Sequence, residues 1–268
     1  MSGFERDVTI GPCRLILGDM RDVLPMIEAR ADMIMSDPPY RLTSGGSTTG
    51  RMGGWMSSKT YDNSGRLFEM VEWVDMAPLM FAAMADDADA IIMTSDREMQ
   101  DARAALQAAG LRFHRVLVWD KITATPNRWF MPDCEFGLYM WKGRARAIRD
   151  CSSKAKIRCP QRDVSQHYLP GDLPPGERAV HPTEKPVPLM ASWIANCTDP
   201  GGLVLDPFMG SGSSLVGAVR TRRRAIGIER DPKWFHVACE RVREAVGSGE
   251  VDAPLFAAET AEQEGFAL

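Results

Sequence analysis

Seven short segments of the chain are nearly all apolar or alternate between apolar and polar positions, as buried β-strands do. The segment "ADMIMSD" is the clearest, because almost every position is apolar and a parallel strand buried on both faces has that pattern. The predicted strands are residues 13–19, 31–37, 88–95, 111–120, 135–141, 202–206 and 224–229.

Segments with helical spacing of apolar residues separate most of these strands. Pro78 predicts a break within the first of them, and Gly110 is a suitable C-terminal cap for the second. The predicted helices are residues 67–85, 97–110, 186–197, 213–222 and 232–246. Alternating strands and helices predict an α/β sandwich with a mainly parallel sheet.

Two internal stretches follow neither pattern. Residues 41–66 are rich in Gly, Ser and Thr and predict a long mobile loop, and regular patterning also fades over residues 142–180. We therefore predict one domain over residues 1–247, which contains both stretches, followed by an acidic, flexible tail at 248–268.

Composition excludes several classes of protein. With 268 residues and 44% hydrophobic positions, the chain can build a core without disulfide or metal support, and its net charge of −4 indicates no particular partner. Cys151, Cys159 and His167 are too widely spaced for a usual zinc knuckle, so we expect no metal. Because no apolar run approaches a membrane span or a signal peptide, we expect a cytoplasmic protein with no membrane partner.

A glycine-rich turn, "LVLDPFMGSGSS", joins a predicted strand to a predicted helix. Gly210 and Gly212 would let the backbone approach a ligand closely, and Ser213 and Ser214 could cap the helix. Glu229 ends the next strand 17 residues after Gly212, where a carboxylate could hold both hydroxyls of a ribose. The turn predicts a cofactor that contains a nucleoside; the alternative is a tight turn with a helix cap.

A second motif, "SDPPY", follows the strand at 31–37. Ligands of parallel α/β sheets bind beyond the carboxyl ends of the strands, and both motifs lie at such ends. We therefore expect the two motifs to form one site, although "SDPPY" alone could be a strand-ending turn with a buried tyrosine.

Three motifs together resemble a known family. "DPFMGSG" resembles the S-adenosylmethionine (SAM) motif of the amino-group DNA methyltransferases, "SDPPY" resembles their catalytic motif, and "HPTEKPVPLM" at 181–190 resembles the motif that precedes the cofactor turn. The order of the motifs resembles that of the β-class of these enzymes, and the resemblance covers about residues 13–245. The resemblance implies a Rossmann-like SAM-dependent methyltransferase fold, with a mainly parallel seven-stranded sheet and helices on both faces.

The chemistry explains the catalytic motif. The lone pair of an exocyclic amine is delocalised into its ring, and two fixed acceptors for the amine hydrogens would free it. Asp37 offers a carboxylate and Pro38 a backbone carbonyl, while Pro38 and Pro39 stiffen the turn. Tyr40 offers a ring on which a flipped-out base can stack.

The resemblance also implies roles around the cofactor. Lys185 would pair with the SAM carboxylate, helped by His181 and Thr183, and Asp19 would lie by the adenine, although a plain turn aspartate and an exposed lysine before a helix are the alternatives. The predicted SAM site comprises Asp19, His181, Thr183, Lys185, Asp206, Pro207, Phe208, Gly210, Ser211, Gly212, Ser213 and Glu229.

A basic stretch predicts where DNA would bind. Residues 142–162 hold eight Lys or Arg against one Asp in a chain that is acidic overall, although a charge run is often only a solvated face. The family resemblance implies that the segment 142–180, between the catalytic and cofactor motifs, is the target-recognition insert. We expect the loop 41–66 to close over the flipped base or to insert into the duplex. The predicted DNA contacts are Arg41, Asn127, Arg128, Lys142, Arg144, Arg146, Arg149, Lys154, Lys156 and Arg158.

The predicted activity is methyl transfer from SAM to adenine N6 in double-stranded DNA, because an aspartate at the first motif position goes more often with adenine in this family. The alternatives are cytosine N4, an RNA or protein amide substrate, and a catalytically silent DNA-binding homologue. A homodimer is possible, and "VDAPLF" at 251–256 could dock on a partner such as a sliding clamp or pack back on the domain.

Overall fold

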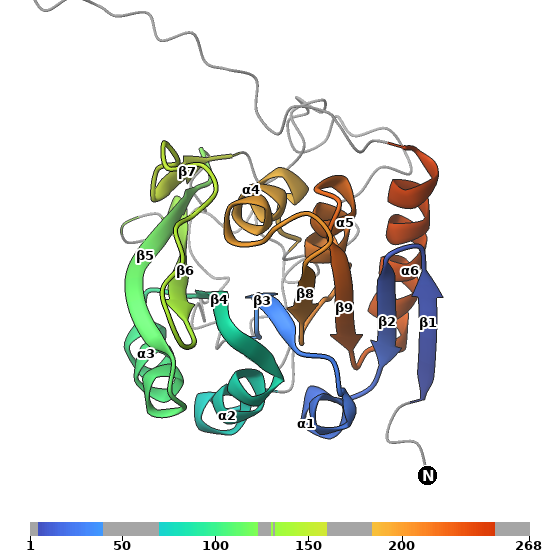
Figure 1. Ribbon diagram of the computed structural model, residues 1–268, viewed down its shortest axis with the longest axis horizontal. Helices are drawn as coiled ribbons and strands as arrows, with labels where there is room; N and C mark the ends of the chain where they lie inside the picture. Colours follow the sequence, from blue (N-terminus) through green and yellow to red (C-terminus); the bar gives the residue numbers. More distant parts are fainter. Residues whose placement is uncertain (1–4, 40–69, 123–129, 131, 160–183, 250–268) are drawn as a thin grey trace, which may run out of the picture.

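The protein folds into one mixed β-sheet with helices on both faces (Figure 1). The computed structural model describes residues 5–39, 70–122, 130, 132–159 and 184–249. The strands are β1 (Arg6–Ile10), β2 (Cys13–Leu17), β3 (Ala31–Ser36), β4 (Met84–Thr94), β5 (Arg112–Asp120), β6 (Cys134–Trp141), β7 (Lys156–Arg158), β8 (Leu203–Asp206) and β9 (Arg224–Glu229). The helices are α1 (Met20–Val23), the 3-10 helix η1 (Leu24–Met26), α2 (Trp73–Ala83), α3 (Met99–Ala108), α4 (Val187–Cys197), α5 (Ser213–Arg220) and α6 (Pro232–Gly247).

The strand order is β1-β2-β9-β8-β3-β4-β6-β5-β7. Every one of the seven predicted strands is present, and within that group of seven only β6 runs antiparallel to its neighbours. The predicted mainly parallel α/β sheet is therefore confirmed. Two short strands that the pattern missed, β1 and β7, extend it at its edges, where little apolar surface is buried.

The sheet separates two hydrophobic layers. Helices α4, α5 and α6 cover one face, and α1, α2 and α3 cover the other (Figure 1). The predicted break at Pro78 is wrong, because α2 continues through it from Trp73 to Ala83. Met76, Ala77 and Met80 on this helix are completely buried, and that burial offsets the hydrogen bond that proline cannot donate.

One carboxylate joins the central strands to the helix that follows them. Strands β3 and β8 are parallel neighbours, so Ser36 and Asp206 end side by side. The Ser36 hydroxyl donates to Oδ1 of Asp206 at 2.7 Å, and the backbone N–H of Phe208 donates to the same oxygen at 3.0 Å. The Ser214 hydroxyl, in the first turn of α5, bonds to the other oxygen. Asp206 thus fixes β3, the turn after β8 and α5 relative to one another.

This buried carboxylate should make stability depend on pH. Burial raises the pKa of Asp206 from 3.8 to about 6, so between these values the folded state binds a proton that the unfolded state releases. Its contribution to the free energy of unfolding is therefore largest below about pH 4 and declines until about pH 6. Asp206→Asn cannot titrate, so the stability of the natural protein relative to this variant should fall by at most about 3 kcal/mol across that range. Urea unfolding of both proteins from pH 4 to 7 measures this difference. Asp75→Asn, on the exposed face of α2, is the control, and parallel curves for Asp206→Asn would contradict the assignment.

Candidate functional site

The carboxyl ends of β2, β3, β8 and β9 lie together at one end of the sheet, because these strands run parallel. This line of strand ends is called the site edge below. Asp37, Asp206 and Glu229 lie at this edge, and Asp19 follows the end of β2. The "SDPPY" strand and the glycine-rich turn are therefore neighbours, as the sequence predicts.

Asp37 is the acid directly after β3. Its Oδ2 lies 2.7 Å from Nζ of Lys185. Its Oδ1 is buried and has no hydrogen-bond partner among the described residues. Burial raises the pKa of Asp37, and the Lys185 ammonium opposes this effect. Buried polar atoms are normally hydrogen-bonded, so this oxygen is a candidate acceptor for a hydrogen-bond donor of a ligand.

Lys185 lies between two carboxylates. The motif resemblance implies that Lys185 pairs with the carboxylate of SAM, which stays a prediction. In the structure its Nζ is 2.7 Å from Asp37 and 3.0 Å from Oε2 of Glu135. Nζ of Lys121 lies 2.5 Å from the other oxygen of Glu135. Burial acts to raise the pKa of Glu135, but the two ammonium groups hold it below its usual value.

Glu135 and Lys121 belong to the site although no sequence motif indicated them. A signal existed, since Glu135 is a charge in the otherwise apolar strand "CEFGLYMW" and Lys121 follows the apolar end of β5. Pairing of Trp119 with Glu135 across β5 and β6 then brings both charges to the edge that carries Asp37.

The glycine-rich turn requires both of its glycines. Gly210 and Gly212 have φ of 52° and 84°, a region that other residues rarely adopt. No described atom lies within 4 Å of a Cβ built on Gly210, so its backbone faces open space, while a Cβ on Gly212 would come 3.1 Å from that of Ala238. Gly210 is therefore open to a ligand, and Gly212 lets α5 pack on α6.

The predicted capping of α5 by Ser213 and Ser214 is wrong. Gly212 is the N-cap residue and makes no side-chain cap, and both serines lie in the first turn of the helix. The Ser214 hydroxyl bonds to Asp206, and the Ser213 hydroxyl accepts from Arg241 at 3.2 Å. The serines thus brace the turn and leave the start of α5 without a side-chain cap.

Arg241 on α6 is a third residue that the sequence did not reveal. Its Nη1 donates to the carbonyl and to the hydroxyl of Ser211, both at 2.8 Å, and its Nη2 lies 2.7 Å from Oε1 of Glu184. Glu184 is linked through Arg241 to the glycine-rich turn, and the next residue, Lys185, is bonded to Asp37. Two consecutive residues therefore connect the two motifs. No local pattern marks Arg241, because its partners are brought to it only by helix packing.

Glu229 supports the glycine-rich turn from the neighbouring strand. Its Oε2 accepts from the N–H of Gly210 at 3.0 Å and its Oε1 from that of Asp231 at 2.7 Å. Burial raises its pKa. Each carboxylate oxygen retains a lone pair for a further donor, so the predicted contact with ribose hydroxyls remains compatible with these bonds.

Asp19 is the N-cap residue of α1 and accepts from the backbone N–H of Arg21 at 2.9 Å. The Arg21 guanidinium, which also bonds to it, holds the pKa of Asp19 below its usual value. The structure therefore gives Asp19 the turn role that was the alternative at this position, and its place by a cofactor adenine stays a prediction.

The first half of the basic stretch, residues 142–149, lies at the opposite end of the strands, called the far edge below. Strand β6 runs away from the site, so Trp141 lies six residues beyond Glu135, about 20 Å along the strand. Lys142 donates to the carbonyls of Phe81 and Met84 at 3.2 and 2.9 Å at the end of α2. Lys142 and the arginines that follow it therefore lie away from Asp37, and their predicted contact with DNA stays a prediction.

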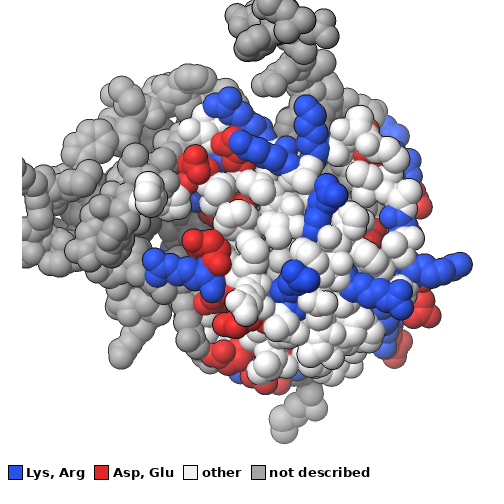
Figure 2. Space-filling view, turned by 90° about the vertical axis from the view of Figure 1, so that its left-hand side faces the viewer, with Lys and Arg blue, Asp and Glu red and all other residues white. Residues whose placement is uncertain are grey.

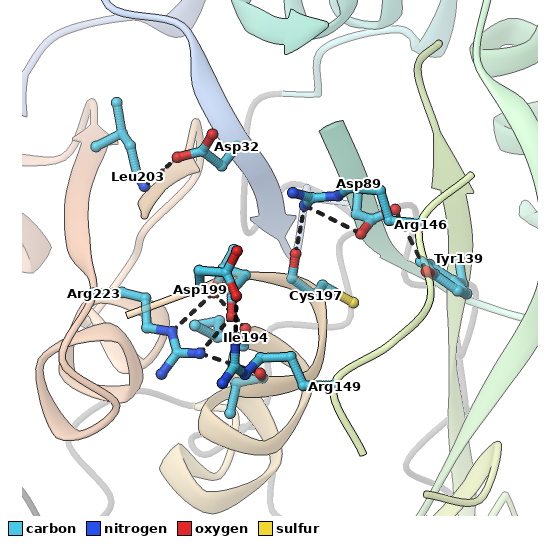
Figure 3. Close-up of polar contacts among 12 residues, drawn as sticks. Asp32, Asp89, Tyr139, Arg146, Arg149, Ile194, Cys197, Asp199, Leu203 and Arg223 are labelled. Atoms are coloured by element: carbon cyan, nitrogen blue, oxygen red, sulfur yellow. Dashed lines mark hydrogen bonds and ion pairs between the residues drawn. The ribbon is translucent and has the colours of Figure 1, made fainter. Parts of the chain in front are cut away.

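Each of those arginines has an acidic partner at that far edge. Arg144 binds Asp87, with its Nη2 at 2.9 Å. Arg146 donates to the Cys197 carbonyl at 2.8 Å and lies 3.4 Å from Asp89, and Arg149 pairs with Asp199 (Figure 3). These side chains tie the segment after β6 to β4 and α4.

The second half of the stretch returns to the site edge. Strand β7 runs parallel to β5, with Lys156 opposite Val118 and Arg158 opposite Asp120. Lys156 is exposed and bonds to Asp120 at 2.8 Å. In Figure 2, which views the molecule from the side of β5 and β7, Lys and Arg are spread among Asp and Glu. The basic stretch is therefore divided between the two ends of the sheet's strands.

Several predicted site residues lie outside the described part of the chain. They are Tyr40, Arg41, Asn127, Arg128, His181 and Thr183, together with the loop 41–66, the end of the 142–180 segment and the tail segment 251–256. Among the described residues, no group of three or more His, Cys, Asp or Glu side chains could hold a metal ion. None of the described helices combines the length and apolar character needed to cross a bilayer.

Comparisons with known proteins agree on one family. The chain is 27% identical over 225 residues to the type II methyltransferase M2.DpnII of Streptococcus pneumoniae, which covers 79% of this chain and 82% of that protein. It is 25% identical over 229 residues to the type II methyltransferase M2.MboI of Moraxella bovis, covering 80% and 81% of the two chains.

Solved structures share the fold. The M1.HpyAVI–SAM complex matches with a TM-score of 0.63 at 21% identity, covering 86% of this chain and 98% of the other. The cytosine-N4-specific PvuII DNA methyltransferase matches with a TM-score of 0.65 at 16% identity, covering 89% of each chain. The profile of the DNA methylase family N6_N4_Mtase matches residues 31–240, and this chain is a member of that DNA methylase family.

Proposed function

We propose that this DNA methylase transfers a methyl group from SAM to the exocyclic N6 of an adenine flipped out of double-stranded DNA. The observation that carries the proposal is Oδ1 of Asp37, a buried acceptor without a partner among the described residues. It lies at the sheet edge that also holds the glycine-rich turn. An amine that must present a hydrogen to an acceptor and its nitrogen to a methyl donor fits between these two features.

Asp37 and Pro38 would activate the amine. Oδ1 of Asp37 accepts one amine hydrogen and the Pro38 carbonyl accepts the other, which frees the nitrogen lone pair from the ring. Asp37 then takes the proton that the nitrogen loses, and the raised pKa of this carboxyl makes it a better acceptor than an exposed aspartate. Tyr40 would hold the face of the base.

The glycine-rich turn would hold SAM. Gly210 presents an open backbone, the start of α5 has no side-chain cap, and Glu229 stands on the next strand for the ribose hydroxyls. When bound, SAM supplies a methyl carbon whose bond to sulfur breaks, with the electron pair remaining on sulfur, as the bond to nitrogen forms. The solved complex of M1.HpyAVI with SAM supports this choice of cofactor.

Cytosine N4 is the second candidate base. The fold of the cytosine-N4-specific PvuII DNA methyltransferase is as similar to this chain as that of M1.HpyAVI. Adenine is favoured by the aspartate at the first position of "DPPY", through the family resemblance. The amine chemistry is the same for both bases.

The first prediction concerns the reaction itself. The natural protein should move labelled methyl groups from SAM to unmethylated genomic DNA, and mass analysis of the nucleosides should find N6-methyldeoxyadenosine. Asp37→Ala should abolish transfer, because it removes the acceptor, while SAM affinity measured by calorimetry stays within about twofold. N4-methyldeoxycytidine instead would change the base and keep the mechanism. SAM binding without any methylated nucleoside would contradict the proposal and indicate another substrate or a silent homologue.

The second prediction concerns the DNA surface. We propose that Lys156 and Arg158, at the site edge, contact phosphates, whereas Arg144 and Arg149, at the far edge, do not. Lys156→Gln with Arg158→Gln should weaken duplex binding and reduce the slope of log K against log salt by up to about 2. Arg144→Gln with Arg149→Gln removes the same charge and serves as the matched control. Equal losses from the two pairs would mean that DNA spans both edges.

A further inference from the structure

Four alternating charges run along the site edge from the catalytic acid into the protein. They are Asp37, Lys185, Glu135 and Lys121, joined by contacts of 2.7, 3.0 and 2.5 Å. Lys121 directly follows β5, Glu135 lies in β6, and Lys185 precedes α4. Only Asp37 among them lies in the strand-end motif that would meet the substrate.

The chain of charges is largely withdrawn from water. The side chains of Asp37, Lys185, Glu135 and Lys121 are 20%, 6%, 15% and 9% exposed. Its two acids balance its two cations, and Lys185 and Glu135 each lie between two groups of opposite charge to their own. Removing either of these charges would leave a buried neighbour uncompensated, so the four charges behave as a unit.

The geometry at Asp37 is asymmetric. Lys185 is bonded to Oδ2, whereas Oδ1 has no partner among the described residues. Glu135 draws the same ammonium toward β6 at 3.0 Å. Without that pull, an ammonium beside a buried carboxylate gains most by sharing both of its oxygens.

We propose that Glu135, itself held by Lys121, is a positioning residue that keeps Lys185 on one oxygen of Asp37 and leaves Oδ1 available to the target amine. This inference rests on the proposed methyl transfer to an exocyclic amine. Glu135 touches neither substrate nor reacting atom, and acts only through Lys185. It gives Lys185 a role at the catalytic acid in place of the predicted role at the cofactor carboxylate.

The test compares single-turnover methyl transfer by four proteins: the natural protein, Glu135→Gln, Lys185→Met and the variant with both changes. Glu135→Gln should slow transfer by roughly 10- to 100-fold, because misplacing a reacting group by about an ångström has that effect. The affinity for SAM should stay within about twofold. Glu240→Gln, an exposed glutamate on α6, makes the same chemical change away from the site and should not alter the rate.

Two readouts separate positioning from a merely structural role. The double variant should be faster than Glu135→Gln, because it lacks the ammonium that would cover Oδ1. The acidic limb of the pH–rate profile should shift to lower pH in Glu135→Gln and to higher pH in Lys185→Met. The charges facing Asp37 from the packed elements are those of Lys185, Glu135 and Lys121, with Asp206 on the adjacent strand, and removing an acid or a cation moves its pKa in opposite directions.

A crystal structure of Glu135→Gln tests the geometry independently of activity. Lys185 within hydrogen-bond distance of both oxygens of Asp37 would support the proposal, and Lys185 still on Oδ2 alone would overturn it. A double variant no faster than Glu135→Gln would also overturn it. If the natural protein transfers no methyl group to DNA, the proposed function fails, while the crystal structure still decides the positioning of Lys185.

Discussion

The hydrogen bonds of Asp206 are the constraint on which the rest of the site depends. This one buried carboxylate accepts from the end of β3, from the turn after β8 and from the first turn of α5. The residue after Ser36 is Asp37, and the residues after Phe208 form the glycine-rich turn. A shift of either strand would therefore separate Asp37, the proposed acceptor for the amine, from the loop proposed to hold the methyl donor.

Electrostatics organises the same edge. Carboxylates gather there because four parallel strands end together, and a low-dielectric edge cannot hold several uncompensated acids. Cations from other elements compensate them: the buried Lys185 and Lys121 beside Asp37 and Glu135, and the partly buried Arg241 beside Glu184. Because Glu184 and Lys185 are consecutive, one short segment before α4 connects both halves of the site.

The basic stretch illustrates why sequence proximity is a poor guide to a surface. Residues 142–158 look like one charge run, yet β6 ends at one edge of the sheet and β7 returns to the other. The arginines of the first part are neutralised by Asp87, Asp89 and Asp199, acids that are 50 or more positions away in the chain. Their side chains tie distant parts of the chain together, and only the second part returns to the end of the sheet that holds Asp37.

The sequence by itself determined the seven strands, the five main helices and the meeting of "SDPPY" with the glycine-rich turn. Apolar periodicity, glycine and proline act locally, and parallel strands bring their carboxyl ends to one edge. Only the tertiary structure decided what the charged side chains do. It directed Lys185 to Asp37 and Glu135, Ser213 to Arg241 and Ser214 to Asp206, and it carried α2 through Pro78. The physical reason is that the energy of a buried charge or an interrupted helix depends on partners far along the chain, and no local pattern names them.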